Sequence, residues 1–271
     1  MKLTDFSAQI ASGLVVPYLG LEIFKGANDL AGKPLPASSD EIILALNDGR
    51  AMAPRLMMEY PRAAMSIEQR KGRKTLEALF ERIYAAGFDP LPVHRLIAAI
   101  NPKIVVDTNR DDALQRLMQG VYTLVYGTAR VAGDLPRFEA QICEGLEGRP
   151  LSPQAITLEK PLLFKPMGVL KPAPSLILSD ADYVDWLTEA MAGLAVPACL
   201  KEKRGELKWL LLGCRFERDT DRMVASEILG GEACAGGWWV TDKTPIAAEV
   251  KFAKRHKLEI IPSDLAAFCG L

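Results

Sequence analysis

Short apolar runs alternate with longer stretches of helical periodicity along the chain. Runs rich in leucine or β-branched residues predict strands at 14–19, 104–108, 122–126, 162–165, 176–178, 209–213, 238–241 and 258–261. The runs 104–106 and 209–212 contain no polar position, which is typical of central parallel strands that are covered on both faces. Strands that alternate with helices in this way predict an α/β protein with a mostly parallel sheet.

Helix signals lie between these strands, and two long segments carry no strand signal. Residues 38–41 have the spacing of a capping box, and apolar residues recur at helical spacing from Leu76 to Ile83. We therefore expect a helical insertion at 28–100 and a second helical segment at 129–159. The whole pattern predicts one Rossmann-like domain over residues 1–271, with helices on both faces of the sheet.

The composition narrows the range of partners. With 271 residues, of which 49% are hydrophobic, the chain has enough apolar matter for a full core. Its formal net charge of −1 gives no electrostatic case for nucleic acid or an anionic membrane as partner. No apolar run approaches the roughly 18 residues of a membrane span. The first apolar run is broken by Pro17, so it predicts a strand rather than a signal peptide, and we expect a cytoplasmic protein.

Cysteine and histidine usage argues against a metal site. The five cysteines include no Cys-x-x-Cys pair, and only two histidines are present. This pattern predicts reduced thiols in or near the core, with no structural zinc and no other metal site.

Four predicted strands end in a glycine or in a cluster of polar residues. The four strand ends are Gly20, the segment 108–111, the segment 165–168, and Gly213. Each could be ordinary turn chemistry, and Asp111 would cap the following helix in any case. Because parallel strands direct their carboxyl ends toward the crevice where α/β proteins bind ligands, four such ends are better explained by one shared site.

Taken in order, these motifs resemble the sirtuin-like NAD-binding family, specifically its bacterial branch without a zinc module. That family has a glycine-rich loop after its first strand, then Thr-Asn-x-Asp, Lys-x-His-Gly, Ser-x-x-Asp-Tyr and a late Leu-Gly strand end. The corresponding residues are Leu19-Gly20, Thr108-Asn109-Arg110-Asp111, Lys165-Pro166-Met167-Gly168, Ser179-Asp180-Ala181-Asp182-Tyr183, and Leu212-Gly213 with Asp219. The resemblance spans residues 14–230.

The resemblance implies a ligand and the residues that contact it. The implied ligand is NAD or ADP-ribose, bound without zinc. Asn109 and Asp111 would be the catalytic candidates, positioned to hold a water molecule. The implied cofactor contacts are Gly20, Thr108, Asn109, Asp111, Gly168, Gly213 and Asp219.

Two departures from the family pattern bear on catalysis. Met167 occupies the position of the histidine that serves as a base, and a thioether cannot accept a proton near neutral pH. General-base catalysis of this kind contributes about 10²- to 10⁴-fold. Leu21 and Glu22 stand where small loop residues are expected. A carboxylate about 4 Å from a phosphate costs on the order of 4 kcal/mol at an effective dielectric near 20.

Three functional hypotheses remain open on the sequence. The departures favour a sirtuin-like pseudoenzyme that is catalytically impaired, retains NAD or ADP-ribose binding and has a regulatory role. The alternative is an NAD glycohydrolase or protein deacylase that works without the usual histidine through Asn109 and Asp111. The third is a protein-interaction module that uses residues 28–100 and has no nucleotide ligand; the sequence does not identify its partner.

Overall fold

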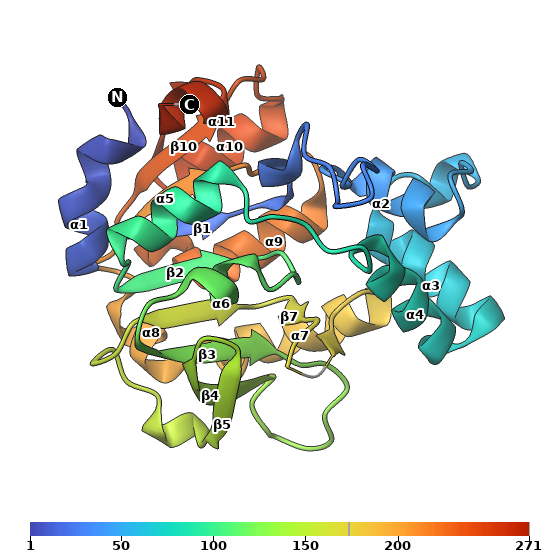
Figure 1. Cartoon of the computed structure of the whole chain (residues 1–271), viewed down its shortest axis with the longest axis horizontal. Coiled ribbons are helices and arrows are strands. Elements are labelled where there is room, and N and C mark those ends of the chain that lie inside the picture. The colour runs from blue at the N-terminus through green and yellow to red at the C-terminus, as the bar shows by residue number, and fades with distance from the viewer. Residues whose placement is uncertain (173, 271) are drawn as a thin grey trace.

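The computed structural model describes residues 1–172 and 174–270 and shows a nine-stranded sheet (Figure 1). The strand order is β11-β10-β9-β1-β2-β6-β3-β4-β5. The parallel strands are β1 (Val15–Leu19), β2 (Ile104–Asp107), β3 (Val121–Gly127), β6 (Leu162–Lys165), β9 (Lys208–Leu212), β10 (Gly237–Thr241) and β11 (Leu258–Pro262). The predicted Rossmann-like α/β class is confirmed.

Residues 129–159 do not form the helical segment that we expected. They contain β4 (Phe138–Glu144) and β5 (Glu147–Leu151), which pair antiparallel at one edge of the sheet. Gly145, at φ +59°, lies in the tight turn between them. β5 is mostly exposed and contains Pro150, so it lacks an apolar run, and its strand conformation comes from pairing with β4.

The strand expected at 176–178 also lies outside the main sheet. It is found as β8 (Ser175–Leu176), which pairs with β7 (Gly168–Val169) in a small two-stranded ladder. Gly168 has φ +90°, and a Cβ atom there would lie 1.9 Å from the Ser175 carbonyl oxygen. The tight turn into this ladder therefore requires glycine at position 168.

Helices cover both faces of the sheet and bury alternate residues of its strands. On one face lie α1 (Ser7–Ser12), α5 (Pro92–Ile100), α6 (Ala113–Leu117) and α11 (Leu265–Cys269). On the other face lie α7 (Asp180–Met191), α8 (Ala198–Lys203), α9 (Asp219–Leu229) and α10 (Ala247–Arg255). Within β1, Val15 and Leu19 belong to the first core, whereas Val16 and Tyr18 belong to the second.

Residues 28–100, where we expected a helical insertion, contain four helices. Three of them, α2 (Ser39–Leu46), α3 (Tyr60–Lys71) and α4 (Arg73–Ile83), group at one side of the sheet in Figure 1. The fourth, α5, returns the chain to the sheet and leads into β2. Short 3₁₀ turns occur at Leu3–Phe6, Leu21–Phe24, Pro54–Leu56, Pro153–Ala155 and Gly231–Ala233. No helix in the described part of the chain is long and apolar enough to cross a membrane.

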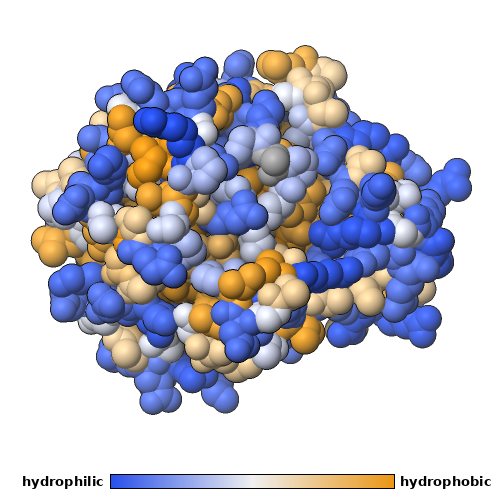
Figure 2. All heavy atoms as spheres, turned by 90° about the horizontal axis from the view of Figure 1, so that it is seen from below, coloured by the Kyte–Doolittle hydropathy of each residue, from blue (hydrophilic) through white to orange (hydrophobic). Residues whose placement is uncertain are grey.

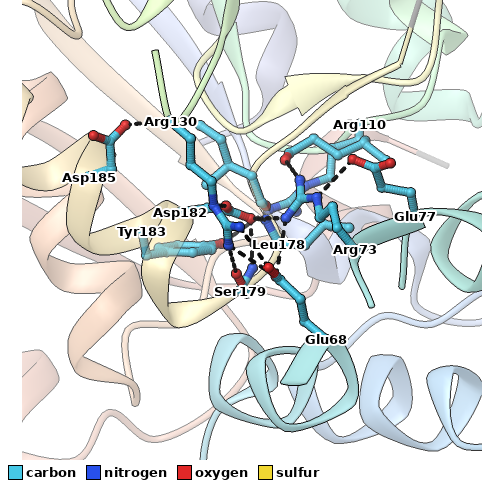
Figure 3. A network of polar contacts seen from close by, with 12 residues as sticks. Glu68, Arg73, Glu77, Arg110, Arg130, Leu178, Ser179, Asp182, Tyr183 and Asp185 are labelled. Carbon is cyan, nitrogen blue, oxygen red and sulfur yellow. Dashed lines mark hydrogen bonds and ion pairs between the residues drawn. The ribbon is translucent and has the colours of Figure 1, made fainter. Parts of the chain in front are cut away.

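A buried carboxylate joins the insertion to the body of the protein (Figure 3). Asp182, at the start of α7, is fully buried and accepts hydrogen bonds from the backbone N–H groups of Leu178 (2.9 Å) and Ser179 (3.0 Å). It also pairs with Arg73 of α4 and, at 2.7 Å, with Arg130 from the loop after β3. Burial alone would raise the pKa of Asp182, but these N–H donors and the Arg73 guanidinium lower it.

We expect Asp182→Ala to lower the free energy of unfolding by about 3 kcal/mol near neutral pH, because the buried N–H groups of Leu178 and Ser179 lose their acceptor. Arg73 and Arg130 also lose one partner, although both still pair with Glu68. Since the folded-state pKa is depressed, this contribution is present above the unfolded pKa of about 4 and is lost as the pH falls through the folded pKa. Urea unfolding at several pH values measures it. Asp180→Ala removes a more exposed carboxylate from the same helix turn and should cost less than about 1 kcal/mol. Equal effects of the two substitutions would contradict this role for Asp182.

Candidate functional site

A pocket lies where the chain reverses its direction of travel across the sheet. From β1 the chain proceeds to β2 on one side, while β9, the other neighbour of β1, leads to β10 and β11 on the opposite side. Ligands of open α/β sheets bind at such a switch point, outside the carboxyl ends of the strands. The pocket encloses about 1000 Å³ of space, part of it open to solvent, between these strand ends and α2, α3 and α9. We call it the polar pocket.

The loop after β1 is closed against the end of β9. The Gly20 N–H donates to the Leu212 carbonyl oxygen (2.9 Å), and the Glu22 N–H donates to the Gly213 carbonyl oxygen (2.8 Å). In a phosphate-binding loop such N–H groups point at the ligand. Here both N–H groups are bonded to carbonyl oxygens of the protein, so neither is free to bind a phosphate. The Glu22 carboxylate lines the pocket and pairs with Lys243 at 2.6 Å, which offsets its charge.

Thr108 and Asn109 line the polar pocket, but their donors tie β2 to β1. The Thr108 hydroxyl donates to the Leu19 carbonyl oxygen (2.9 Å). The Asn109 side-chain amide donates to the Gly20 carbonyl oxygen (3.2 Å) and to Asp107 Oδ1 (3.0 Å). Among the described residues Asn109 Oδ1 has no such bond, so this oxygen remains as an acceptor.

Asp111 does not line the polar pocket. Only 2% exposed, it accepts a hydrogen bond (2.8 Å) from the N–H of Ala113, the first residue of α6. Its other oxygen has no partner among the described residues. Burial raises the pKa of Asp111, against the opposing charge of Lys165. Lys165 is itself fully buried and paired with Asp107, so Asp111 belongs to a polar cluster beneath the strand ends.

Met167 lies in the wall of the polar pocket and is 3% exposed. Among the described residues neither histidine lines this pocket. His94 is buried on α5 between Phe24 and Phe88, where burial lowers its pKa. His256 is also buried and contacts the Phe252 carbonyl oxygen through Nδ1 (2.9 Å).

The three remaining residues implied as cofactor contacts do not line the polar pocket. Gly168 is the first residue of β7, in the small β7–β8 ladder described above. Gly213 lines a second cavity, on the other side of the junction between β1 and β9. Asp219 begins α9, has an 81% exposed side chain and pairs with Arg222. The expectation that Gly213 and Asp219 contact a ligand of the polar pocket therefore finds no geometric basis.

Arg110 and two tyrosines form the floor of the polar pocket, and our sequence interpretation gave none of them a role. Arg110 Nη2 donates to the hydroxyls of Tyr60 and Tyr183 (3.1 Å for Tyr183) and to the Ile177 carbonyl oxygen (2.7 Å). The two hydroxyls lie 2.5 Å apart. Burial raises the pKa of both tyrosines, so they remain neutral. Burial by itself lowers the pKa of Arg110, but the oxygens of Tyr60 and Tyr183 raise it overall. Although Arg110 and Tyr183 lie within the quoted motifs, no local pattern connects them to Tyr60.

Asp221, on α9, is a further pocket residue that the sequence interpretation missed. It is partly exposed within the pocket, and no ion pair or hydrogen bond to its carboxylate occurs among the described residues. Burial and the charge of Glu59 raise its pKa to about 7, although Arg110 and Arg218 oppose this shift. A carboxyl group that ionises near neutral pH within a cleft is a common feature of functional sites.

Comparisons with known proteins identify no family for this chain. No protein-family model matches the chain, and a search of curated proteins found no significant relative. Among the described residues no group of three or more potential metal ligands is found. The fold and the site together define an α/β protein with a Rossmann-like sheet and a polar pocket at its switch point.

We expect Gly20→Ala to destabilise the protein by about 1–3 kcal/mol, because the added Cβ would overpack the junction. It would lie 2.5 Å from the Gly213 carbonyl oxygen and 2.8 Å from the Cys214 sulfur. Gly205→Ala is the control, since the nearest atom to its Cβ would be 3.5 Å away. Chemical denaturation compares the two variants, and an unchanged stability in Gly20→Ala would show that the loop is not closed.

We also expect Asp221→Asn to stabilise the protein in a pH-dependent way. The folded-state pKa of about 7 lies above the unfolded value of about 4, so the wild type loses stability through this group as the pH rises between them. The melting temperature of Asp221→Asn should therefore match that of the wild type near about pH 4 and exceed it from about pH 7 upward. Thermal unfolding across this range measures the difference, and a difference independent of pH would exclude a raised pKa at Asp221.

Proposed function

We propose that this chain is a sirtuin-like domain that binds NAD or ADP-ribose in the polar pocket without efficiently cleaving it. The proposal combines the sequence resemblance with a pocket at the position where α/β sheets bind nucleotides. In this proposal the protein is a pseudoenzyme, which acts by binding the ligand and not by converting it.

The observation that carries the proposal is the environment of Met167. Its side chain is at the pocket wall, and no imidazole among the described residues lines the pocket to replace the missing base. The Cys214 thiol lines the pocket, but burial raises its pKa well above the ordinary value, so it remains a neutral thiol. Asp221 is the pocket group that could exchange a proton near pH 7.

The alternative of an enzyme that works through Asn109 and Asp111 is less favoured by the geometry. Asp111 is buried away from the pocket and accepts a hydrogen bond from the first N–H of α6. The N–H groups of the Asn109 amide are bonded to Gly20 and Asp107, so only its Oδ1 is left to contact a water molecule. Without a second positioned group, neither residue forms the paired arrangement that water activation requires.

A role as a protein-interaction module has no specific observation in its favour. Hydrophilic side chains cover most of the face drawn in Figure 2, and its apolar side chains occur in several separate groups. A large contiguous apolar patch would be the usual mark of a docking surface.

Two measurements on the wild type test the proposal. ADP-ribose and NAD should each raise the melting temperature, because a ligand that binds the folded state stabilises it by mass action. NAD incubated with the protein should release nicotinamide no faster than NAD in buffer. Release that disappears in Asn109→Ala or Asp111→Ala would establish the enzymatic alternative, and no ligand-induced shift would reject nucleotide binding.

Met167→His should increase NAD cleavage by less than about tenfold, below the range of a properly placed general base. The reason is that the loop N–H groups and the Asn109 amide remain bonded within the protein. Chromatographic detection of nicotinamide measures the rate, and Met167→Leu is the control for altered packing. An increase of about 10²-fold or more would show a complete pocket that lacks only its base.

A further inference from the structure

Four cationic side chains line the polar pocket, and three of them have acidic partners. Lys243 pairs with Glu22 at 2.6 Å, and Arg218 pairs with Asp40 at 3.4 Å. Arg215 pairs with Glu217 and, at 3.2 Å, with the fully buried Glu249 of α10. These pairs largely cancel their charges along the rim and walls, so they add little net attraction for an ionic ligand.

Arg110 and Asp221 are the lining charges that have no ion-pair partner among the described residues. The hydrogen bonds of Arg110 go to neutral tyrosine hydroxyls and a carbonyl oxygen. Asp221 has no hydrogen bond to a described residue, so its oxygens are acceptors that the protein leaves unsatisfied. The two charges come from different elements, the end of β2 and α9.

The charged groups that act on Asp221 come from several elements. Arg110, Arg218 and Arg222 attract its charge at longer range, while Glu59, just before α3, repels it. The other titratable groups near it are Tyr18, Tyr60, Tyr183 and Cys214. Burial raises the pKa of each of these four groups, so they remain neutral near pH 7.

We infer that Asp221 is the specificity-determining residue of the polar pocket, and that its carboxylate accepts hydrogen bonds from hydroxyl or amino groups of the ligand. This inference rests on the proposed nucleotide-binding function and identifies the part of the ligand that is recognised. The closed loop offers few N–H donors to a phosphate, whereas an unsatisfied carboxylate in a partly apolar pocket suits a ribose diol or an exocyclic amino group.

The ionisation of Asp221 gives this contact a pH dependence. A hydrogen-bond donor on the ligand favours the carboxylate over the carboxylic acid, so binding lowers the pKa of Asp221 from its free value of about 7. By linkage, affinity must rise as the pH increases through that value. A pKa decrease of about one unit corresponds to an affinity gain of about fivefold between about pH 6 and about pH 8.5.

Calorimetric titration of the full chain with ADP-ribose and with adenosine tests the inference. Neither ligand titrates in this pH range, so a pH effect reports on the protein. The wild type should bind both ligands about fivefold more tightly at about pH 8.5 than at about pH 6. Asp221→Asn should bind about tenfold more weakly than the wild type at the higher pH and lose the pH dependence. Glu227→Gln removes a charge from the same helix outside the polar pocket and should behave as the wild type.

The outcomes separate the inference from the function on which it rests. If the wild type binds neither ligand at any pH, nucleotide binding itself is rejected. If the wild type binds but Asp221→Asn binds equally well or more tightly, the function stands and the role of Asp221 is rejected. Affinity that increases as the pH falls would also reject it, because the ligand would then prefer the protonated acid.

Discussion

The buried guanidinium of Arg110 is the interaction on which the site depends. It follows β2 and reaches the hydroxyl of Tyr60 from the insertion and that of Tyr183 from α7. A buried charge is costly unless its hydrogen bonds are satisfied. Through Nη2, Arg110 therefore links the end of β2 to the insertion and to α7, while its Nε has no partner among the described residues. Asp182 of α7 likewise forms ion pairs with Arg73 of the insertion and with Arg130 from the loop after β3.

Several residues that resemble a nucleotide-binding motif serve here to hold the strand ends together. Gly20 allows β1 and β9 to approach closely, while Thr108 and Asn109 bond β2 to β1. Asp111 accepts a hydrogen bond from the first N–H of α6. Because these groups are bonded within the protein, the pocket has fewer free donors than a loop built to hold a pyrophosphate. The lining carboxylate that has no partner among the described residues is that of Asp221, on α9.

The fold was largely predictable because a buried strand is recognisable from a short apolar run in the local sequence. The apolar runs of β2 and β9 require cover on both faces, and the helical periodicity between strands implies parallel connections. The hairpin of β4 and β5 was not predictable in this way. An edge strand with one solvated face and a proline carries little apolar signal, so pairing rather than composition determines its conformation.

The sequence alone determined the class of the sheet, the strand ends that meet at its edge and the absence of histidine at position 167. These are properties of local residue order, since apolar runs, glycines and a missing imidazole are visible without coordinates. Only the tertiary structure decided which polar groups are used within the protein and which face the pocket. Tyr60, Arg110, Tyr183 and Asp221 come from segments far apart in the chain, and their hydrogen bonds and ionisation depend on burial and neighbours that folding alone creates.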